Sequence, residues 1–239
     1  TIAIVDPALV EAVPDFIAAD TGMDVLTHAT EAYTSNFAND YTDGIALQTI
    51  KLVFEWLEKS VKTADPEARE KMHNASTMAG MAFANAFLGM SHSMAHKIGA
   101  VHHTVHGRTN AILLPYVIRY NGTRPSKTTT WPKYNYYRAD EKYQDIARML
   151  GLPASTPEEG VESYAKAVYE LGERVGIEMN FKAQGIDEKE WKEHSRELAF
   201  LAYEDQCSPA NPRLPMVDHM QEIIEDAYYG YKERPGRRK

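Results

Sequence analysis

The sequence predicts an all-α fold, and three features of the chain support that prediction. Helix-start signals, in which a capping side chain precedes proline, occur at Asp6-Pro7, Asp65-Pro66 and Thr156-Pro157. Apolar residues recur at intervals of three and four, which places them on one face of a helix. Beyond the first five residues, no stretch alternates between apolar and polar residues as a half-buried strand does.

The first 35 residues are expected to contain one strand and two helical segments. Residues 1–5 look like a short buried strand left from a preceding domain, and Asp6-Pro7 starts the first helical turn. Pro14-Asp15 restarts or bends the chain before Gly22, and a helix follows from about Asp24 to Ser35. Because no methionine opens it, we expect the chain to be part of a longer polypeptide.

Two long helices are expected next. The segment Asn39 to Thr42 interrupts the chain, and Thr42 is suited to cap a helix over Asp43 to Val61. Asp65-Pro66 then starts a helix of about Glu67 to Leu88. The second half of that helix is small or apolar nearly all round, which is typical of a central buried helix.

Four further helices are expected in the C-terminal half: Tyr143 to Leu150, one beginning at Thr156-Pro157, Glu188 to Ala202 capped by Asp187, and Met216 to Tyr229. The stretch from Thr123 to Arg138 has no period and is expected to be a loop or arm. Its aromatic residues are expected to pack on their own domain, with a partner chain as the alternative: Trp131, Tyr134, Tyr136 and Tyr137. Residues 230–239 are expected to form a flexible tail.

A histidine-rich segment lies between residues 89 and 121. Of the nine histidines in the chain, it contains His92, His96, His102, His103 and His106. His92 and His96 are four residues apart, so on a helix they stack on one face. Gly107 is suited to end that helix in the left-handed conformation, after which a helix resumes near Asn110 and ends at Asn121-Gly122. One helix and its exit turn can therefore direct several imidazoles to one point.

A carboxylate partner for these imidazoles occurs upstream. Asp24 and His28 are also four residues apart, on a second predicted helix. Imidazole is the commonest side-chain metal ligand, and carboxylate is its usual companion for a hard or borderline divalent ion. Either pair alone is more often solvated or buried in a core, but the two together predict a site made of Asp24, His28, His92 and His106.

These segments resemble a known family. The runs MDVLTHATEAY and GMSHSMAHKIGAVHHTVHGRTNAILLPYVIRYN resemble the signature segments of the iron-dependent (group III) alcohol dehydrogenases. Within that family the chain is most similar to the alcohol dehydrogenase part of the bifunctional aldehyde–alcohol dehydrogenases. Residues Asp205 to Arg213 resemble the C-terminal D-x-C-x-x-x-N-P-R pattern of the family. The resemblance runs from Thr1 to about Tyr229 and implies a helical, dehydroquinate synthase-like metal-binding domain over 1–239.

The resemblance also implies roles for particular residues. Asp24, His28, His92 and His106 match the iron ligands of the family. His96 matches a histidine beside the nicotinamide and the substrate, and is expected to serve as a catalytic and cofactor-binding residue in proton relay. His103 lies near the same cleft by spacing, with a direct role less expected. The family often has proline before the last ligand, where this chain has Val105; we expect a slightly looser turn and intact ligation.

The ligand set does not determine which metal ion binds. Three histidines and one aspartate accept Fe²⁺, Zn²⁺, Co²⁺ or Ni²⁺, so Fe²⁺ follows from the resemblance and Zn²⁺ is a possible substitute. Glu31 is either a hydrogen-bond partner of a ligand histidine or a solvated helix glutamate. Cys207 is expected to be a packed thiol rather than a nucleophile. Asn211 to Arg213 is expected to be a structural turn whose arginine can pair with a carboxylate.

The implied reaction needs a nicotinamide cofactor, and the sequence contains no G-x-G-x-x-G or other glycine-rich phosphate loop. The family places its dinucleotide-binding half before the metal-binding half. We therefore expect NAD(H) to be bound mainly by a missing N-terminal domain, and the isolated chain to turn over poorly. The implied activity is the interconversion of acetaldehyde and ethanol, or similar short aldehydes and primary alcohols, in fermentation.

Two other functions stay open at this point. A zinc or other metal-dependent hydrolase would need a glutamate base in an H-E-x-x-H motif, and Ser93 occupies the glutamate position. A non-catalytic assembly module is the other, because the bifunctional proteins that the chain resembles form helical filaments. A homo-oligomer or filament formed through the full-length protein is compatible with the dehydrogenase function as well.

Composition excludes some classes of function. The formal net charge of −8 argues against nucleic-acid binding, and the only basic cluster is the C-terminal Lys232 to Lys239. There is no apolar run near twenty residues and no signal-peptide layout, so neither membrane insertion nor secretion is expected. A single cysteine excludes an intrachain disulfide and fits a reducing cytoplasm.

Overall fold

The computed structural model describes residues 2–125 and 137–230, and these residues contain helices and no strand. The all-α class is therefore confirmed. The α-helices are α1 (Asp15–Thr34), α2 (Asp40–Thr63), α3 (Pro66–Ala86), α4 (Met90–His102), α5 (His106–Gly122), α6 (Ala139–Met149), α7 (Pro157–Arg174), α8 (Glu188–Tyr203) and α9 (Val217–Tyr229). Short 3-10 helices are η1 (Pro7–Val10), η2 (Lys182–Gln184) and η3 (Ser208–Ala210).

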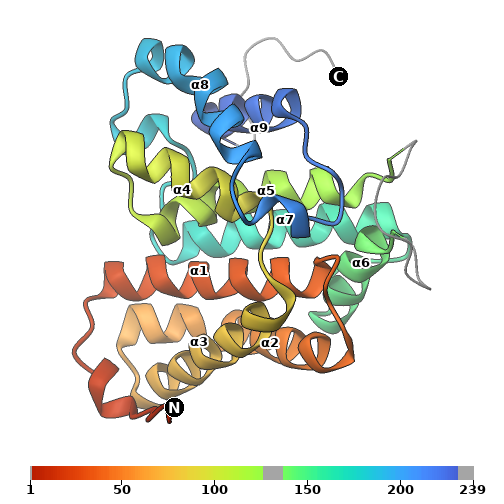
Figure 1. Cartoon of the computed structure of the whole chain (residues 1–239). Coiled ribbons are helices and arrows are strands. Elements are labelled where there is room, and N and C mark those ends of the chain that lie inside the picture. Colours follow the sequence, from red (N-terminus) through yellow and green to blue (C-terminus); the bar gives the residue numbers. More distant parts are fainter. Residues whose placement is uncertain (1, 126–136, 231–239) are drawn as a thin grey trace.

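Helix α1 runs across the middle of the molecule (Figure 1). It packs against α2 and α3 on one side and against α5 on the other, while α4 packs against α5 and α8, and α8 against α9. The buried apolar residues form two clusters. One joins α1, α2 and α3 to α6 and α7, and the other joins α4 to α8 and α9. Helix α5 contributes to both, with Leu114 in the first and Leu113 in the second.

The strand expected over residues 1–5 is not formed. Residues 2–5 make no strand and are exposed. A strand satisfies its backbone groups through a neighbouring strand, and the described part of the chain offers none. The helix that carries Asp24 and His28 was also predicted too short, because α1 begins at Asp15 and not near Asp24. Gly22 lies inside α1, where a Cβ atom would stand 2.2 Å from Cδ1 of Leu57 on α2.

The predicted capping signals occur at helix starts, but the cap of α2 was assigned to the wrong residue. Asp65 accepts from the backbone N–H of Ala68 at 3.0 Å, as expected for the start of α3. At α2 the cap is Asn39, whose side chain accepts from the N–H of Thr42 at 3.3 Å. The Thr42 hydroxyl accepts in return from the Asn39 N–H at 2.9 Å. Thr42 is therefore the reciprocal partner in a capping box and not the cap itself.

The turn between α4 and α5 lies earlier than predicted, and α5 begins at His106 and not near Asn110. His103, and not Gly107, has the left-handed conformation, with φ of 54°. Gly107 is the second residue of α5, where a Cβ atom would lie 2.2 Å from the backbone oxygen of Asp20 on α1. Glycine is needed there because α5 crosses α1 closely. This crossing brings the first residue of α5, His106, next to α1.

The aromatic segment is only partly described. Trp131, Tyr134 and Tyr136 lie outside the described residues, as does the tail from residue 231. The hydroxyl of Tyr137 donates to the backbone oxygens of Asn121 and Thr123, so this residue packs on its own domain, as expected. Among the described residues, no helix is both long enough and apolar enough to cross a bilayer.

Candidate metal centre

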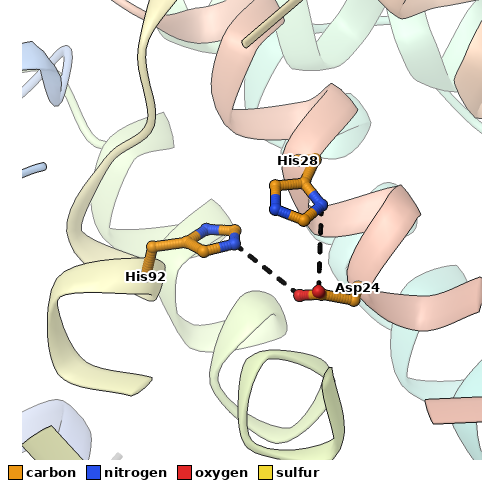
Figure 2. Close-up of side chains that lie close together, drawn as sticks. All are labelled: Asp24, His28 and His92. Carbon is orange, nitrogen blue, oxygen red and sulfur yellow. Dashed lines mark ion pairs between the residues drawn. The ribbon is translucent and has the colours of Figure 1, made fainter. Parts of the chain in front are cut away.

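The four residues predicted as metal ligands meet where α1, α4 and α5 pack together. Asp24 and His28 lie one turn apart on α1, His92 is in the first turn of α4, and His106 opens α5. Figure 2 shows the Asp24 carboxylate facing both His28 and His92. Its oxygens lie 3.9 Å from Nδ1 of His28, 3.6 Å from Nε2 of His92 and 3.7 Å from Nε2 of His106.

These distances fit a shared cation better than direct hydrogen bonds. A nitrogen–oxygen hydrogen bond is normally no longer than about 3.2 Å. Two atoms that each bind one tetrahedral ion at about 2.1 Å are about 3.4 Å apart. His92 is 1% exposed, and its Nε2 has no hydrogen-bond partner in the described part of the chain. One ligand atom each of Asp24, His28 and His92 lies within 4.8 Å of the other two. The residues present therefore fit a divalent metal ion.

His106 is the most exposed of the four residues. Its side chain is 43% exposed, its Nε2 faces Asp24, and its ring centroid lies 5.4 Å from that of His92. Its Nε2 lies 3.2 Å from Nδ2 of Asn110, which also donates to Oδ1 of Asp24 at 2.8 Å. Asn110 was not among the predicted site residues. Val105, which stands where the family often has proline, has a φ of −66°. Proline would impose nearly the same value, so the turn before His106 keeps that geometry.

Glu31 orients His92. It is buried, and its Oε2 accepts from Nδ1 of His92 at 2.6 Å and from the N–H of Gly89 at 3.0 Å. Its other oxygen accepts from the N–H of Ser91 at 2.7 Å. With Nδ1 donating to Glu31, Nε2 of His92 is left facing Asp24. Of the two expectations for Glu31, the hydrogen-bond partner is confirmed and the solvated glutamate is wrong.

The charges of Asp24 and His28 suit a cation, whereas His92 has to lose a proton to bind one. Burial alone would raise the pKa of Asp24, but the imidazoles of His92, His28 and His106 lower it to about 2. Asp24 is thus a carboxylate at neutral pH. Burial lowers the pKa of His28 to about 4, so this imidazole is neutral and keeps a lone pair. For His92, burial lowers the pKa, but the carboxylates of Asp24 and Glu31 outweigh burial and raise it to about 9.

His96 stands beside this group and is held from a second direction. Its ring is stacked on that of His106, with centroids 5.5 Å apart, and its side chain is 34% exposed. Oδ2 of Asp205 accepts from Nδ1 of His96 at 3.1 Å and pairs with Lys97 at 2.8 Å. The backbone N–H of Cys207 donates to Asp205, and burial raises the pKa of the Cys207 thiol to about 12. This agrees with the expectation of a packed, unreactive cysteine.

The turn that contains Asn211 and Arg213 is structural, although the arginine has a different partner from the one expected. In the described part of the chain Arg213 pairs with no carboxylate. It donates to the backbone oxygen of Tyr120 at 2.8 Å and lies 4.0 Å from the centre of that ring. The Asn211 side-chain oxygen accepts from the N–H of Met90 at 3.2 Å and from Asn121 at 3.1 Å. This turn therefore ties the start of α4 to the end of α5.

Comparison with known proteins points to one family. Residues 18–228 match the family described as "Fe-containing alcohol dehydrogenase family, C-terminal". The chain is 88% identical over its full length to the aldehyde-alcohol dehydrogenase of Streptococcus pneumoniae, of which it covers 27%. It is 41% identical, over 95% of its length, to the bifunctional aldehyde-alcohol dehydrogenase of Escherichia coli, of which it covers 26%.

A solved structure shows the same fold. The iron-containing alcohol dehydrogenase of Thermococcus thioreducens matches 96% of this chain with a TM-score of 0.83 and 35% identity, and the match covers 55% of that protein. By contrast, the chain spans only about a quarter of the length of the two aldehyde-alcohol dehydrogenases, at 27% and 26%.

Proposed function

The chain belongs to the Fe-containing alcohol dehydrogenase family, and on that basis we propose that it is the metal-binding catalytic part of an NAD(H)-dependent, iron-dependent alcohol dehydrogenase. The enzyme would interconvert short aldehydes such as acetaldehyde and primary alcohols such as ethanol, within a bifunctional aldehyde–alcohol dehydrogenase. The observation that carries the proposal is the meeting of Asp24, His28, His92 and His106 from three helices. Nε2 of His92, which has no hydrogen-bond partner among the described residues, faces Asp24 there.

Asp24, His28, His92 and His106 would hold the metal ion. When bound, a divalent ion supplies Lewis acidity that polarises the oxygen of the substrate. Glu31 fixes the ring of His92, and the side-chain nitrogen of Asn110 contacts both Asp24 and His106. Fe²⁺ is proposed from the family, and the donor set also accepts Zn²⁺.

His96 is proposed to move the proton. Reduction of an aldehyde transfers hydride from NADH to the carbonyl carbon and a proton to the carbonyl oxygen, which yields the alcohol and NAD⁺. Asp205 holds one ring nitrogen of His96, so the other nitrogen exchanges the proton. The partial exposure of His96 gives that proton a path to solvent. Oxidation of the alcohol reverses each transfer.

NAD(H) is proposed to bind mainly to a part of the polypeptide outside this chain. The chain covers 55% of the Thermococcus thioreducens enzyme, and it contains no glycine-rich phosphate loop of its own. We further propose that the whole protein works in the cytoplasm as a homo-oligomer or filament.

The proposal is tested in a chimera in which this chain replaces the matching segment of the Streptococcus pneumoniae relative. After loading with Fe²⁺ without oxygen, the chimera should consume NADH when acetaldehyde is added, as followed by nicotinamide absorbance. His92→Ala should lower that rate by at least about 100-fold, because loss of a ligand exceeds the 10–100-fold effect of losing a partner of a ligand.

The matched control is His103→Asn. His103 is exposed, and asparagine tolerates its left-handed conformation, so the rate should be unchanged. A His92→Ala chimera as active as the parent would contradict the proposal. So would a metal-dependent ester hydrolysis that needs no nicotinamide, which the hydrolase alternative predicts.

A further inference from the structure

A second group of metal-ligand side chains lies at the other end of α4. It consists of His102, the last residue of α4, with Glu190 and His194, which are four residues apart on α8. One ligand atom of each lies within 4.8 Å of the other two. His102 follows His92 by ten positions, which correspond to about 15 Å along a helix, so the second group is separate from the Asp24 centre.

The packing of α4 against α8 brings these residues together (Figure 1). Nδ1 of His102 is 3.5 Å from Oε1 of Glu190, and the rings of His102 and His194 are 5.3 Å apart between centroids. The i, i+4 spacing puts Glu190 and His194 on the same face of α8. Two helices, α4 and α8, thus present three ligands to one point.

Two ring nitrogens in this group are buried with no hydrogen-bond partner in the described part of the chain. The His102 side chain is 2% exposed, and within the described residues its Nε2 has no hydrogen-bond partner. The same holds for Nδ1 of His194. Buried polar atoms in folded proteins nearly always have a partner, so two such atoms in one group indicate a bound species that satisfies them.

The chemistry of the group favours a cation. Burial lowers the pKa of His102, although Glu190 opposes this, so His102 is neutral near pH 7 and can donate a lone pair. Two imidazoles with one carboxylate suit a borderline first-row ion such as Zn²⁺, Co²⁺ or Ni²⁺. The Glu190 side chain is 52% exposed, which leaves a route from solvent to the site.

We propose that His102, Glu190 and His194 form a second divalent-metal site, which takes Zn²⁺ or a similar borderline ion and clamps α8 to α4. The clamp has a structural consequence for the Asp24 centre. Helix α8 leads into Asp205, which holds His96 on α4. A metal joining the end of α4 to α8 therefore fixes the two segments that position His96.

The number of metal ions bound tests the proposal directly. Isothermal titration and equilibrium dialysis with Zn²⁺ should give two equivalents for the chain. His194→Ala and Glu190→Gln should each retain one equivalent and weaken the other by at least about 100-fold, since a ligand is lost. His92→Ala should lose the metal ion of the Asp24 centre and keep the one bound by His102, Glu190 and His194. Glu193→Gln is the matched control, because Glu193 is an exposed carboxylate on the same helix, and it should keep both.

A second readout is thermal unfolding in the His92→Ala background, where the Asp24 centre is disabled. Zn²⁺ should raise the unfolding midpoint of His92→Ala and leave that of His92→Ala/His194→Ala unchanged, because an ion stabilises only the fold that binds it. Circular dichroism of the metal-free variants establishes that both are folded. A single equivalent in the unmutated chain that His92→Ala removes, a second equivalent that survives both ligand substitutions, or a crystal structure with water between the three side chains would overturn the proposal.

Discussion

At the scale of single residues, Glu31 determines how His92 faces the proposed metal centre. Its carboxylate accepts from the His92 ring and from two backbone N–H groups at the start of α4. A helix N-terminus stabilises a negative charge, so Glu31 is held in place by the same helix that carries His92. The orientation of one imidazole therefore depends on a side chain that touches no substrate.

Glu31→Gln should weaken Fe²⁺ binding by about 10–100-fold, the usual effect of losing the hydrogen-bond partner of a ligand histidine. Glutamine keeps the shape of the side chain but lacks the charge and the second acceptor oxygen. Competition against a chromophoric chelator, without oxygen, measures the affinity. Glu70→Gln, an exposed glutamate of α3, is the control and should bind as the parent does. Equal affinity in both variants would show that Glu31 does not orient His92.

Cys207 should react slowly with alkylating agents. Burial raises the pKa of its thiol from 9.0 to about 12, which lowers the thiolate fraction at pH 8. Because the thiolate is the reactive form, alkylation should be about 1000-fold slower in the folded than in the unfolded chain. The unfolded thiol ionises first as pH rises, so this group also lowers stability between about pH 9 and 12. Mass spectrometry after timed iodoacetamide treatment measures the rate of alkylation. Rapid labelling of the folded chain would contradict the prediction that Cys207 reacts slowly.

At the scale of helices, the proposed metal centre depends on how closely α1 and α5 approach. Gly107 permits that approach, since a Cβ atom there would meet the backbone of Asp20 at 2.2 Å and Cβ of Asp24 at 3.1 Å. Backbone atoms cannot move aside as a flexible side chain can. The distance between His106 and Asp24 is therefore set by the glycine next to His106.

Gly107→Ala should destabilise the chain by about 1–3 kcal/mol, the usual effect of overpacking, and weaken Fe²⁺ binding because His106 is displaced from Asp24. Chemical denaturation and metal titration measure the two effects. Gly44→Ala is the control: Gly44 lies in α2 with no atom within 4 Å of the added carbon, so stability should rise by about 0.4–1 kcal/mol. A Gly107→Ala variant as stable as the parent would contradict the close crossing.

The helices and the proposed ligands could be predicted from the sequence because both follow from local spacing. The i, i+4 pairs and the cap–proline signals need no knowledge of distant residues. The turn at His103 was missed because local preference assigns the left-handed conformation to Gly107, whereas the contact with Asp20 requires glycine inside α5. Histidine is among the residues enriched in that conformation, which makes His103 an acceptable substitute.

The supporting side chains could not be predicted, because their partners are far away in the sequence. Asn110 donates to Asp24 across 86 positions, and His96 meets Asp205 across 109. No periodicity relates such positions. Only Glu31 was a candidate beforehand, since it lies one turn beyond His28 on the same helix.

At the scale of the whole molecule, the proposed metal centre lies between the two apolar clusters. Helix α1, with Asp24 and His28, belongs to one cluster, and α4, with His92, belongs to the other. Helix α5, which begins with His106, contributes to both. A metal held by all three helices therefore links the two parts of the core.

Fe²⁺ should accordingly stabilise the whole chain and not only the site. At a concentration 100 times the Kd, a ligand stabilises the fold by about 2.7 kcal/mol. For a chain of this size that corresponds to a rise in Tm of roughly 5–10 °C. Calorimetry without oxygen measures the shift, which should be largely lost in His92→Ala. An unchanged Tm at saturating Fe²⁺ would show that the metal does not link the clusters.

The most direct test of the central claim is anomalous diffraction at the iron absorption edge, on crystals grown with Fe²⁺ in the absence of oxygen. We expect an iron peak between α1, α4 and α5, about 2.0–2.2 Å from ligand atoms of Asp24, His28, His92 and His106. An iron-saturated crystal without a peak at that position, or with a peak that Asp24 and His106 do not share, would contradict the proposed metal centre.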